Sequence, residues 1–213
     1  MHALVLSLAL AASTWWPAHA LLPAQPAAHN LPAEADRLFE TLALREGMTV
    51  GEIGAGAGEL TVLIARRLGP AGGVHSTDIN ADRLREIRKA VETAELQNVS
   101  VIEGGSVTTN LPDSCCDAIF MRSVYHHFED PVAMNASILR ALKPGGRLAV
   151  MDFKPDHRRT ASPGKRAAGD DHGVMPETVV AEATQAGFES LQTVEDWPGR
   201  LFLVLLRKPG ATP

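Results

Sequence analysis

The residues with the clearest chemical potential in this chain are three alternating glycines and an acid that follows them. Gly54, Gly56 and Gly58 come directly after residues 49–53, which are expected to form a buried strand, and Asp78 ends the next expected strand. Glycine tolerates positive φ and lets backbone N–H groups approach a ligand closely. A carboxylate about twenty residues beyond such a turn can accept hydrogen bonds from both hydroxyls of a ribose. The pattern therefore predicts a site for a cofactor that contains adenosine.

The spacing of the glycines separates two classes of cofactor. Nicotinamide dinucleotides are bound by G-x-G-x-x-G, whose third glycine would fall at Glu59 or Thr61 in this chain. The Tyr-x-x-x-Lys pair of short-chain oxidoreductases is also missing, because Tyr125 is followed at that spacing by Glu129. Both observations argue against an NAD-type oxidoreductase. Taken alone, the glycines could also form a plain strand-to-helix turn.

Several motifs in order resemble those of class I S-adenosylmethionine-dependent methyltransferases. Glu52 and the three glycines match motif I, [D/E]-x-G-x-G-x-G, and residues 142–150 match the signature L-x-P-G-G-x-L-x-[V/I]. Residues 123–128 resemble the LHHF stretch of the small-molecule, quinone-biosynthesis-type branch, and the resemblance extends over about residues 33–207. It implies that S-adenosylmethionine is the cofactor. It also implies that the glycine turn holds the methionine end and that Glu52 organises the amino group.

The order of the expected elements agrees with this resemblance. Strands and helices alternate, which predicts an α/β fold with a doubly wound sheet. The family adds a seventh, antiparallel strand, so the fold expected is a seven-stranded, mostly parallel, Rossmann-like methyltransferase sheet. Helices are expected at residues 33–44, 59–68, 81–94, 131–142 and 176–186, and strands at 49–53, 73–77, 99–103, 117–122, 147–152, 190–195 and 201–207.

Cofactor residues are expected where the strands end, because ligands of open α/β sheets bind beyond the carboxyl ends of the strands. Asp78 is expected to bind the ribose, with a helix-capping or surface acid as the alternative. Ile79 is expected to pack on the adenine, although an apolar residue there is more often core. At the third strand the family usually has Gly-Asp-Ala, and the run Gly104-Gly105-Ser106 lacks that carboxylate. The cofactor-binding candidates are Glu52, Gly54, Ala55, Gly56, Gly58, Asp78, Ile79, Gly105, Ser106 and Arg122.

His126, His127 and Asp152 are the catalytic candidates. Histidine titrates near neutrality and can take a proton from the acceptor during methyl transfer. The alternative is that one histidine orients a loop while the other is partly buried, and that Asp152 is a hydrogen-bonded loop acid. Residues 154–175 are either a mobile lid or a solvated charged loop, and His172 in this segment loosely resembles a histidine of some small-molecule relatives.

Cysteine usage and charge exclude several other classes. Cys115 and Cys116 are the only cysteines, their spacing matches no metal motif, and they give no argument for a structural disulfide. No metal site is predicted. The net charge is −5 with acids and bases interspersed, and no basic stripe is present. Nucleic acid is therefore not expected as a partner, and a small molecule is.

The chain is expected to divide into three parts. Residues 1–20 contain no charged residue of the types Lys, Arg, Asp or Glu and resemble a signal peptide, residues 21–32 form a Pro/Ala-rich linker, and residues 33–208 form the methyltransferase domain. A mis-assigned start or a disordered leader is the alternative for the first part. Export or membrane association conflicts with a cofactor made in the cytosol, so localisation stays open, as does oligomeric state.

The function expected is methyl transfer from S-adenosylmethionine to a small-molecule acceptor. The motifs do not identify the acceptor, because its pocket is built from loops that vary between relatives. A non-catalytic domain that binds an adenosine cofactor is the first alternative, supported by the missing carboxylate at the third strand. An NAD-type oxidoreductase is the second.

Overall fold

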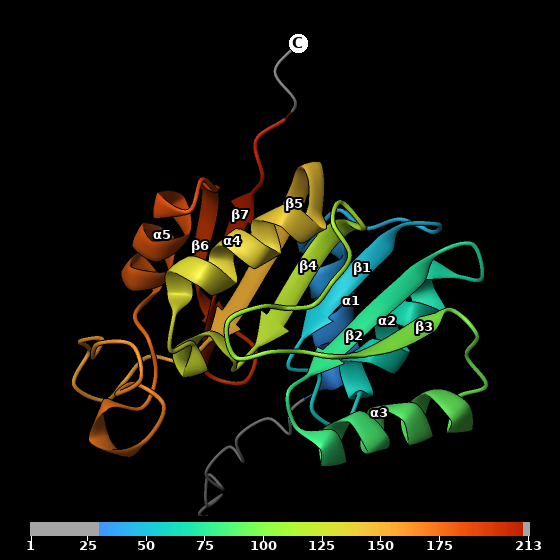
Figure 1. Ribbon diagram of the computed structural model, residues 1–213, viewed down its shortest axis with the longest axis horizontal. Coiled ribbons are helices and arrows are strands. Elements are labelled where there is room, and N and C mark those ends of the chain that lie inside the picture. The colour runs from blue at the N-terminus through green and yellow to red at the C-terminus, as the bar shows by residue number, and fades with distance from the viewer. Residues whose placement is uncertain (1–29, 211–213) are drawn as a thin grey trace, which may run out of the picture.

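Strands and helices alternate along the chain and build one sheet with helices on both faces (Figure 1). The computed structural model describes residues 30–210. The α-helices are α1 (Leu31–Thr41), α2 (Glu59–Leu68), α3 (Ala81–Thr93), α4 (Pro131–Ala141) and α5 (Pro176–Gln185), and the 3-10 helices are η1 (Tyr125–His127) and η2 (Gly169–Asp171). The strands are β1 (Thr49–Ile53), β2 (Gly73–Asp78), β3 (Val99–Glu103), β4 (Cys116–Arg122), β5 (Leu142–Asp152), β6 (Glu189–Trp197) and β7 (Leu201–Arg207).

The sheet has the predicted topology. Its seven strands lie in the order β3-β2-β1-β4-β5-β7-β6. All neighbours from β3 to β5 are parallel, whereas β7 runs antiparallel to both β5 and β6. This confirms the doubly wound, mostly parallel sheet with an antiparallel last strand. Because β1 pairs with both β2 and β4, the chain reverses its direction of winding there, and ligands of such sheets bind at that point.

Two apolar cores lie on the two faces of the sheet. Ile64 of α2 belongs to the core that includes α1, and Ile138 of α4 belongs to the core that includes α5. Successive side chains of a strand point to opposite faces, so the neighbours Ile119 and Phe120 of β4 are buried in different cores. Because the strands are buried on both faces, only their ends can contact a ligand.

Several element boundaries differ from prediction by one to five residues, and two of these differences have identifiable reasons. α1 begins at Leu31 rather than at residue 33, because the Asn30 side chain accepts from the Ala33 N–H and Pro32 is tolerated in a first turn. β5 begins at Leu142 rather than at 147, because Leu142 pairs with Cys116 before the register shifts to Ala118 opposite Arg147. The Pro-Gly-Gly turn is thus a bulge inside a strand.

The two cysteines correct a further expectation. The Sγ atoms of Cys115 and Cys116 form a disulfide, which was not predicted from the sequence. The expectation failed because it considered only bonds between distant parts of the chain. A bond between neighbours closes no long loop, so it constrains the unfolded chain little. Cys116 itself is fully buried in the core, as expected from its place before Asp117.

The segments predicted as a signal peptide (residues 1–20) and as most of the linker (residues 21–32) lie outside the described residues. Among residues 30–210, no helix is both long and apolar enough to span a bilayer.

Candidate functional site

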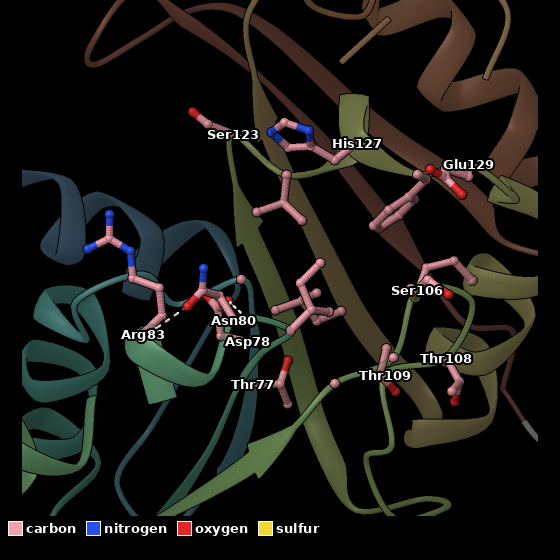
Figure 2. Close-up of a pocket in the computed structure, with 18 of the residues that line it drawn as sticks. Thr77, Asp78, Asn80, Arg83, Ser106, Thr108, Thr109, Ser123, His127 and Glu129 are labelled. Carbon is pink, nitrogen blue, oxygen red and sulfur yellow. Dashed lines mark hydrogen bonds between the residues drawn. The ribbon is translucent and has the colours of Figure 1, made fainter. Parts of the chain in front are cut away.

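A cavity of about 660 Å³ lies at the carboxyl ends of β1, β2, β3 and β4. Figure 2 shows Asp78 and Asn80 on one side of it and Ser123 and His127 on another. This size is within the range of about 300–1,000 Å³ that is typical for small-molecule sites. The lining residues are Ile53, Gly54, Thr77, Asp78, Ile79, Asn80, Arg83, Gly104, Gly105, Ser106, Thr108, Thr109, Arg122, Ser123, Val124, His127, Phe128, Glu129, Met134 and Ala167.

The glycine turn is required by close packing on two sides. A Cβ on Gly54 would lie 2.4 Å from Cγ2 of Val124, which follows β4 across the switch point. A Cβ on Gly58 would lie 3.2 Å from the backbone of Ile87 in α3. Both glycines also have positive φ, of 68° and 82°. Gly54 lines the cavity, and it has no side chain to clash with Val124 there. Gly58 is the N-cap of α2, and its missing side chain lets the turn pack closely on α3.

The backbone amides of this turn are occupied within the protein. Ala55 donates to the Thr77 carbonyl at 2.9 Å and Gly58 donates to the Ala55 carbonyl at 2.9 Å. Gly56 donates to Oδ2 of Asp78 at 3.1 Å. In the described structure these three N–H groups are therefore bonded within the protein, and contact between the turn and the cofactor stays a prediction. The turn offers the cavity a backbone surface without side chains.

Asp78 lies where the ribose prediction requires it. It ends β2, lines the cavity, and is fixed through both carboxylate oxygens, because Oδ1 also accepts from the Asn80 N–H at 2.9 Å. An ionised carboxylate has about four acceptor positions, and two backbone bonds leave the others for ligand hydroxyls. The acid is therefore oriented before a ligand arrives. Its role in ribose binding stays a prediction.

The neighbouring candidates flank Asp78 along the cavity wall. Ile79 is 69% exposed although it is large and apolar, so it is not a core residue and is free to pack on a flat ring. Gly105 donates to the Thr108 carbonyl at 2.8 Å, which turns the chain back beyond β3, and Ser106 is exposed at the same wall. No carboxylate from this turn lines the cavity, in agreement with the sequence.

Glu52 lies beneath the cavity and not in its lining. It is buried, and its carboxyl group accepts a short hydrogen bond from the Thr61 hydroxyl. Burial raises the pKa of Glu52 to about 8, with a further increase from Asp78, and the Thr61 hydrogen bond opposes this. The carboxyl group is thus held in an apolar environment that favours its neutral form.

Arg122 reaches the cavity from β4 and is held there by a buried acid. Its Nε donates to Glu34 of α1 at 3.1 and 3.3 Å. Trp197, at the end of β6, donates its Nε1–H to the same carboxylate at 3.1 Å. Glu34 is 88 residues away from Arg122 in the sequence, and no local pattern pointed to it.

The catalytic candidates form a group beside the cavity. Asp152 is buried at the end of β5 and accepts from His126 twice, from Nδ1 at 2.8 Å and from the backbone N–H at 3.1 Å. His126 is also buried, and neither residue lines the cavity, whereas His127 is exposed and does. Partial burial lowers the pKa of His127, and the neighbouring His126 lowers it further. His127 is therefore the candidate that can meet a substrate in its neutral form.

His172 joins this group from the loop before α5. Its Nε2 lies 3.1 Å from Nε2 of His126. Its ring meets the ring of Phe153 edge-on, at a centroid distance of 4.8 Å. His126 and His172 are 46 positions apart in the sequence, so no local motif predicted this contact. The position of His172 before the last helix was a weak signal.

The loop of residues 153–175 is tied to the domain by a buried arginine. The Arg166 side chain is fully buried and binds Glu182 of α5 through both Nη atoms, at 2.9 and 3.0 Å. Its guanidinium lies over the Tyr125 ring, 5.5 Å from the centroid. Arg166 is therefore not the solvated charge expected in this segment. The adjacent Ala167 lines the cavity, so this anchor sets the cavity's outer wall.

The cavity brings together six of the ten predicted cofactor residues, namely Gly54, Asp78, Ile79, Gly105, Ser106 and Arg122. Glu52, Ala55, Gly56 and Gly58 do not line the cavity. Prediction missed the apolar wall made by Val124, Phe128 and Met134. These residues follow β4 or lie in α4, where an apolar side chain is normally assigned to the core.

Comparison with known proteins places this geometry in a family. A family model of the methyltransferase domain matches residues 44–195. The ubiquinone/menaquinone biosynthesis C-methyltransferase UbiE of Shewanella halifaxensis is 34% identical over 121 residues, which are 56% of this chain and 48% of that protein. A demethylmenaquinone methyltransferase of Listeria welshimeri is 28% identical over 114 residues, 54% of this chain and 48% of that protein. The chain spans about half the length of the curated relatives it matches.

A solved structure agrees with these relatives. The S-adenosylmethionine-dependent methyltransferase from Aquifex aeolicus superimposes with a TM-score of 0.70 at 25% identity, covering 81% of this chain and 88% of that one. Together with the family model, this confirms the resemblance read from the motifs, including S-adenosylmethionine as the cofactor. The model covers well over half of the sequence, and the chain therefore belongs to the class I S-adenosylmethionine-dependent methyltransferases.

Proposed function

We propose that this protein transfers the methyl group of S-adenosylmethionine to a small-molecule acceptor. The observation that carries the proposal is the single cavity surface that joins Asp78 to His127 across the switch point. The end at Asp78 suits the nucleoside of the cofactor, and the end at His127 suits the group that receives the methyl. Methyl transfer needs both held in line, and positioning supplies most of the catalysis.

The nucleoside end follows from the chemistry of its residues. Asp78 has acceptor positions for ribose hydroxyls, and Ile79 offers an apolar surface for the adenine. Gly54 has no side chain between the β1 end and the cavity. When bound, S-adenosylmethionine supplies a methyl group on a positively charged sulfur. Glu52 is buried and does not line the cavity. It supports the nucleoside end indirectly, through its packing and through its buried carboxyl group.

The acceptor end is assigned to the wall beyond β4. Val124, Phe128 and Met134 provide apolar surface there, and His127 and Glu129 provide polar groups. In the proposed reaction the acceptor atom forms a bond to the methyl carbon, and the electron pair of the carbon–sulfur bond stays on sulfur. His127, with its lowered pKa, is positioned to accept the proton that an O–H or N–H acceptor loses.

The acceptor class is proposed from the relatives. Their names place them in ubiquinone and menaquinone biosynthesis, where the enzyme of Shewanella halifaxensis is a C-methyltransferase. The apolar wall beside His127 fits a flat hydroxylated ring of that kind. We therefore propose a hydroxylated aromatic or quinone-like acceptor, with carbon or oxygen as the methylated atom.

Calorimetry and a turnover assay test the proposal separately. We expect the purified protein to bind S-adenosylmethionine and S-adenosylhomocysteine and not NAD. We then expect release of S-adenosylhomocysteine with a panel of hydroquinones and phenols, and less with amines or thiols. Tighter binding of NAD than of S-adenosylmethionine would overturn the proposal.

A second candidate function is a non-catalytic domain that binds the same cofactor. The specific observation in its favour is the turn Gly104-Gly105-Ser106, which lacks the carboxylate expected for the adenine amino group. This candidate predicts cofactor binding with no turnover on any member of the acceptor panel.

From residues 1–20 we separately propose that the protein is exported or associated with a membrane. Their composition is that of a signal peptide or a membrane-associated leader. Fractionation of cells that express the full chain tests this, with N-terminal sequencing of the recovered protein. Recovery of an uncleaved chain only in the soluble cytoplasmic fraction would contradict it.

A further inference from the structure

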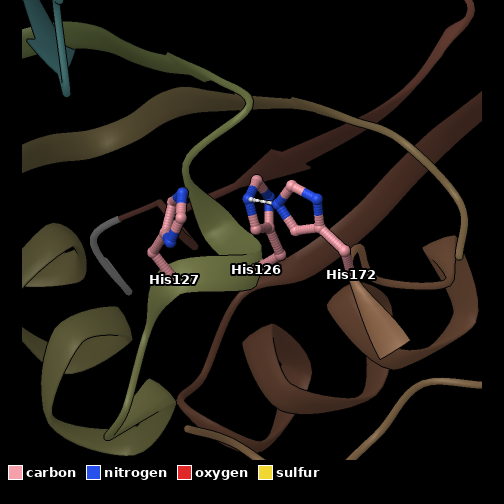
Figure 3. Close-up of side chains that lie close together, drawn as sticks. All are labelled: His126, His127 and His172. Atoms are coloured by element: carbon pink, nitrogen blue, oxygen red, sulfur yellow. Dashed lines mark hydrogen bonds between the residues drawn. The ribbon is translucent and has the colours of Figure 1, made fainter. Parts of the chain in front are cut away.

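Three imidazole rings converge beside the cavity. His126 and His127 come from η1, and His172 comes from the loop before α5 (Figure 3). One ring nitrogen from each lies within 4.8 Å of the others. Figure 3 shows His126 between the other two, with the 3.1 Å contact to His172 drawn. The sequence suggested no metal site, because it separates His172 from the pair.

Asp152 fixes the orientation of the central ring. Its carboxylate accepts from Nδ1 of His126 at 2.8 Å, and both of its oxygens accept backbone N–H groups, of His126 and Phe153. Nδ1 therefore carries the hydrogen, and the lone pair of Nε2 points toward His172. A buried carboxylate that orients a histidine in this way is the usual partner of a metal-bound imidazole.

The distance between His126 and His172 fits one shared metal ion. Imidazole nitrogens bind Zn²⁺ at about 2.0–2.1 Å, so two of them at a tetrahedral angle lie roughly 3.4 Å apart. The observed 3.1 Å between the Nε2 atoms of His126 and His172 is close to this value. His127 and His172 are exposed, so their rings can turn to complete the set around the fixed His126.

We propose that His126, His127 and His172 bind one divalent transition-metal cation, with Zn²⁺ as the representative ion. Three protein ligands leave a fourth position open, which is the arrangement of catalytic rather than structural zinc sites. Since His127 also lines the cavity, that position lies at the acceptor end. The proposed function assigns no metal ion, and the metal site does not depend on it.

The role of the ion rests on the proposed function. A metal at this place would bind an acceptor hydroxyl as an oxygen ligand and favour its deprotonated form, because a bound cation lowers the pKa of its ligands. With the ion bound, His127 is a ligand and not the proton acceptor, so the hydroxyl proton leaves to solvent. The anionic oxygen or its conjugated ring carbon then attacks the methyl group as the carbon–sulfur bond breaks; after attack by carbon, the proton on that carbon is lost and the oxygen regains one. Hydroxylated acceptors would then depend on the metal, and acceptors without a hydroxyl group would not.

Metal titration of the untagged full chain tests the site. After dialysis against a chelator, we expect Zn²⁺ to bind with one equivalent per chain, and Co²⁺ to give the absorption of a tetrahedral, nitrogen-ligated ion. His127→Gln and His172→Gln should each weaken Zn²⁺ binding by more than about tenfold, since even the loss of an outer partner costs 10–100-fold. Asp152 is a positioning residue, and Asp152→Asn should fall within that range.

His157→Gln is the matched control, because His157 is exposed in the same loop and outside the cluster. It should bind Zn²⁺ like the unsubstituted protein. The proposal is overturned if the unsubstituted protein binds no stoichiometric Zn²⁺, or if either His127→Gln or His172→Gln binds it with unchanged affinity. Circular dichroism of each variant establishes that it is folded.

Titration with S-adenosylmethionine, with and without Zn²⁺, separates this inference from the proposed function. Loss of Zn²⁺ binding in His172→Gln with unchanged cofactor binding supports the metal site alone. Zn²⁺ binding in a protein that binds no S-adenosylmethionine would leave the metal site standing and remove the proposed function.

Discussion

Two acids that the motif assigns to one cofactor lie in opposite environments. Asp78 lines the cavity and is held by two backbone N–H groups. Glu52 is buried below the turn, with Thr61 as its hydrogen-bond donor. Burial favours the neutral form of the Glu52 carboxyl group. The two carboxyl groups therefore serve different physical purposes.

Replacement of Asp78 should weaken cofactor binding. Asp78→Ala removes the acceptor for ribose hydroxyls, and we expect a loss of about 1–3 kcal/mol in binding free energy, the cost of leaving polar partners unpaired. Calorimetric titration with S-adenosylmethionine measures this. Asp113→Ala is the control, because Asp113 is exposed and lies outside the cavity. An unchanged dissociation constant for Asp78→Ala would place the ribose elsewhere.

Glu52 should make the stability of the ligand-free protein fall as pH rises. Its folded pKa is about 8, whereas the ordinary pKa of glutamate is 4.5, so between these pH values the folded protein holds a proton that the unfolded chain has lost. The free energy of unfolding then decreases with pH, by at most about 1.4 kcal/mol per pH unit from this group. Urea unfolding across this pH window should show a shallower dependence for Glu52→Gln. Parallel curves for the two proteins would contradict the assignment.

At the scale of elements, the site is made where strand ends meet across the switch point. The turn after β1 lies against Val124 after β4, and the tip of β2 holds that turn through Asp78. Each contact joins segments that are adjacent in the sheet and distant in sequence. The glycine turn is thus shaped by its neighbours as much as by its own residues.

Gly54→Ala should destabilise the fold by two separable effects. The φ of 68° costs alanine about 1–2 kcal/mol, and crowding against Val124 adds about 1–3 kcal/mol. Gly56→Ala is the control, because its φ is 57° and nothing lies within 4 Å of an added Cβ. It should show the backbone effect alone. Denaturant unfolding measures both.

Val124→Ala in the Gly54→Ala background isolates the crowding. We expect the double variant to be more stable than the sum of the two single changes predicts, because the smaller side chain leaves room for the new Cβ. Strict additivity would mean that the clash is relieved by movement elsewhere.

Local patterns predicted the elements well and the long-range contacts poorly. The alternation of strands and helices, the mostly parallel sheet and the antiparallel β7 follow from the sequence pattern and from the family's topology. The buried Arg166 could not be foreseen, since a charged residue in a polar loop carries no periodicity. Nor could the Glu34–Arg122 pair or the approach of His172, because each depends on packing between distant segments.

At the scale of the whole molecule, a bound cofactor should stabilise the fold. The cavity exists only when the ends of β1 to β4 are assembled, so a ligand there binds the folded state alone. At a hundred times its dissociation constant, S-adenosylmethionine should add about 2.7 kcal/mol, or a rise in Tm of roughly 5–11 °C for a chain of this size. Differential scanning fluorimetry measures it, and Asp78→Ala at the same concentration should show a smaller rise.

The buried carboxylate of Glu34 has a practical consequence for anyone who shortens this protein. It joins the first described helix, the tip of β4 and the last residue of β6. Trimming to the family-model limits of 44–195 would discard Glu34, Trp197 and the whole of β7. The guanidinium of Arg122 would lose its anchoring acid, and β5 would gain an open edge. An expression fragment should therefore begin no later than residue 30 and extend through residue 207.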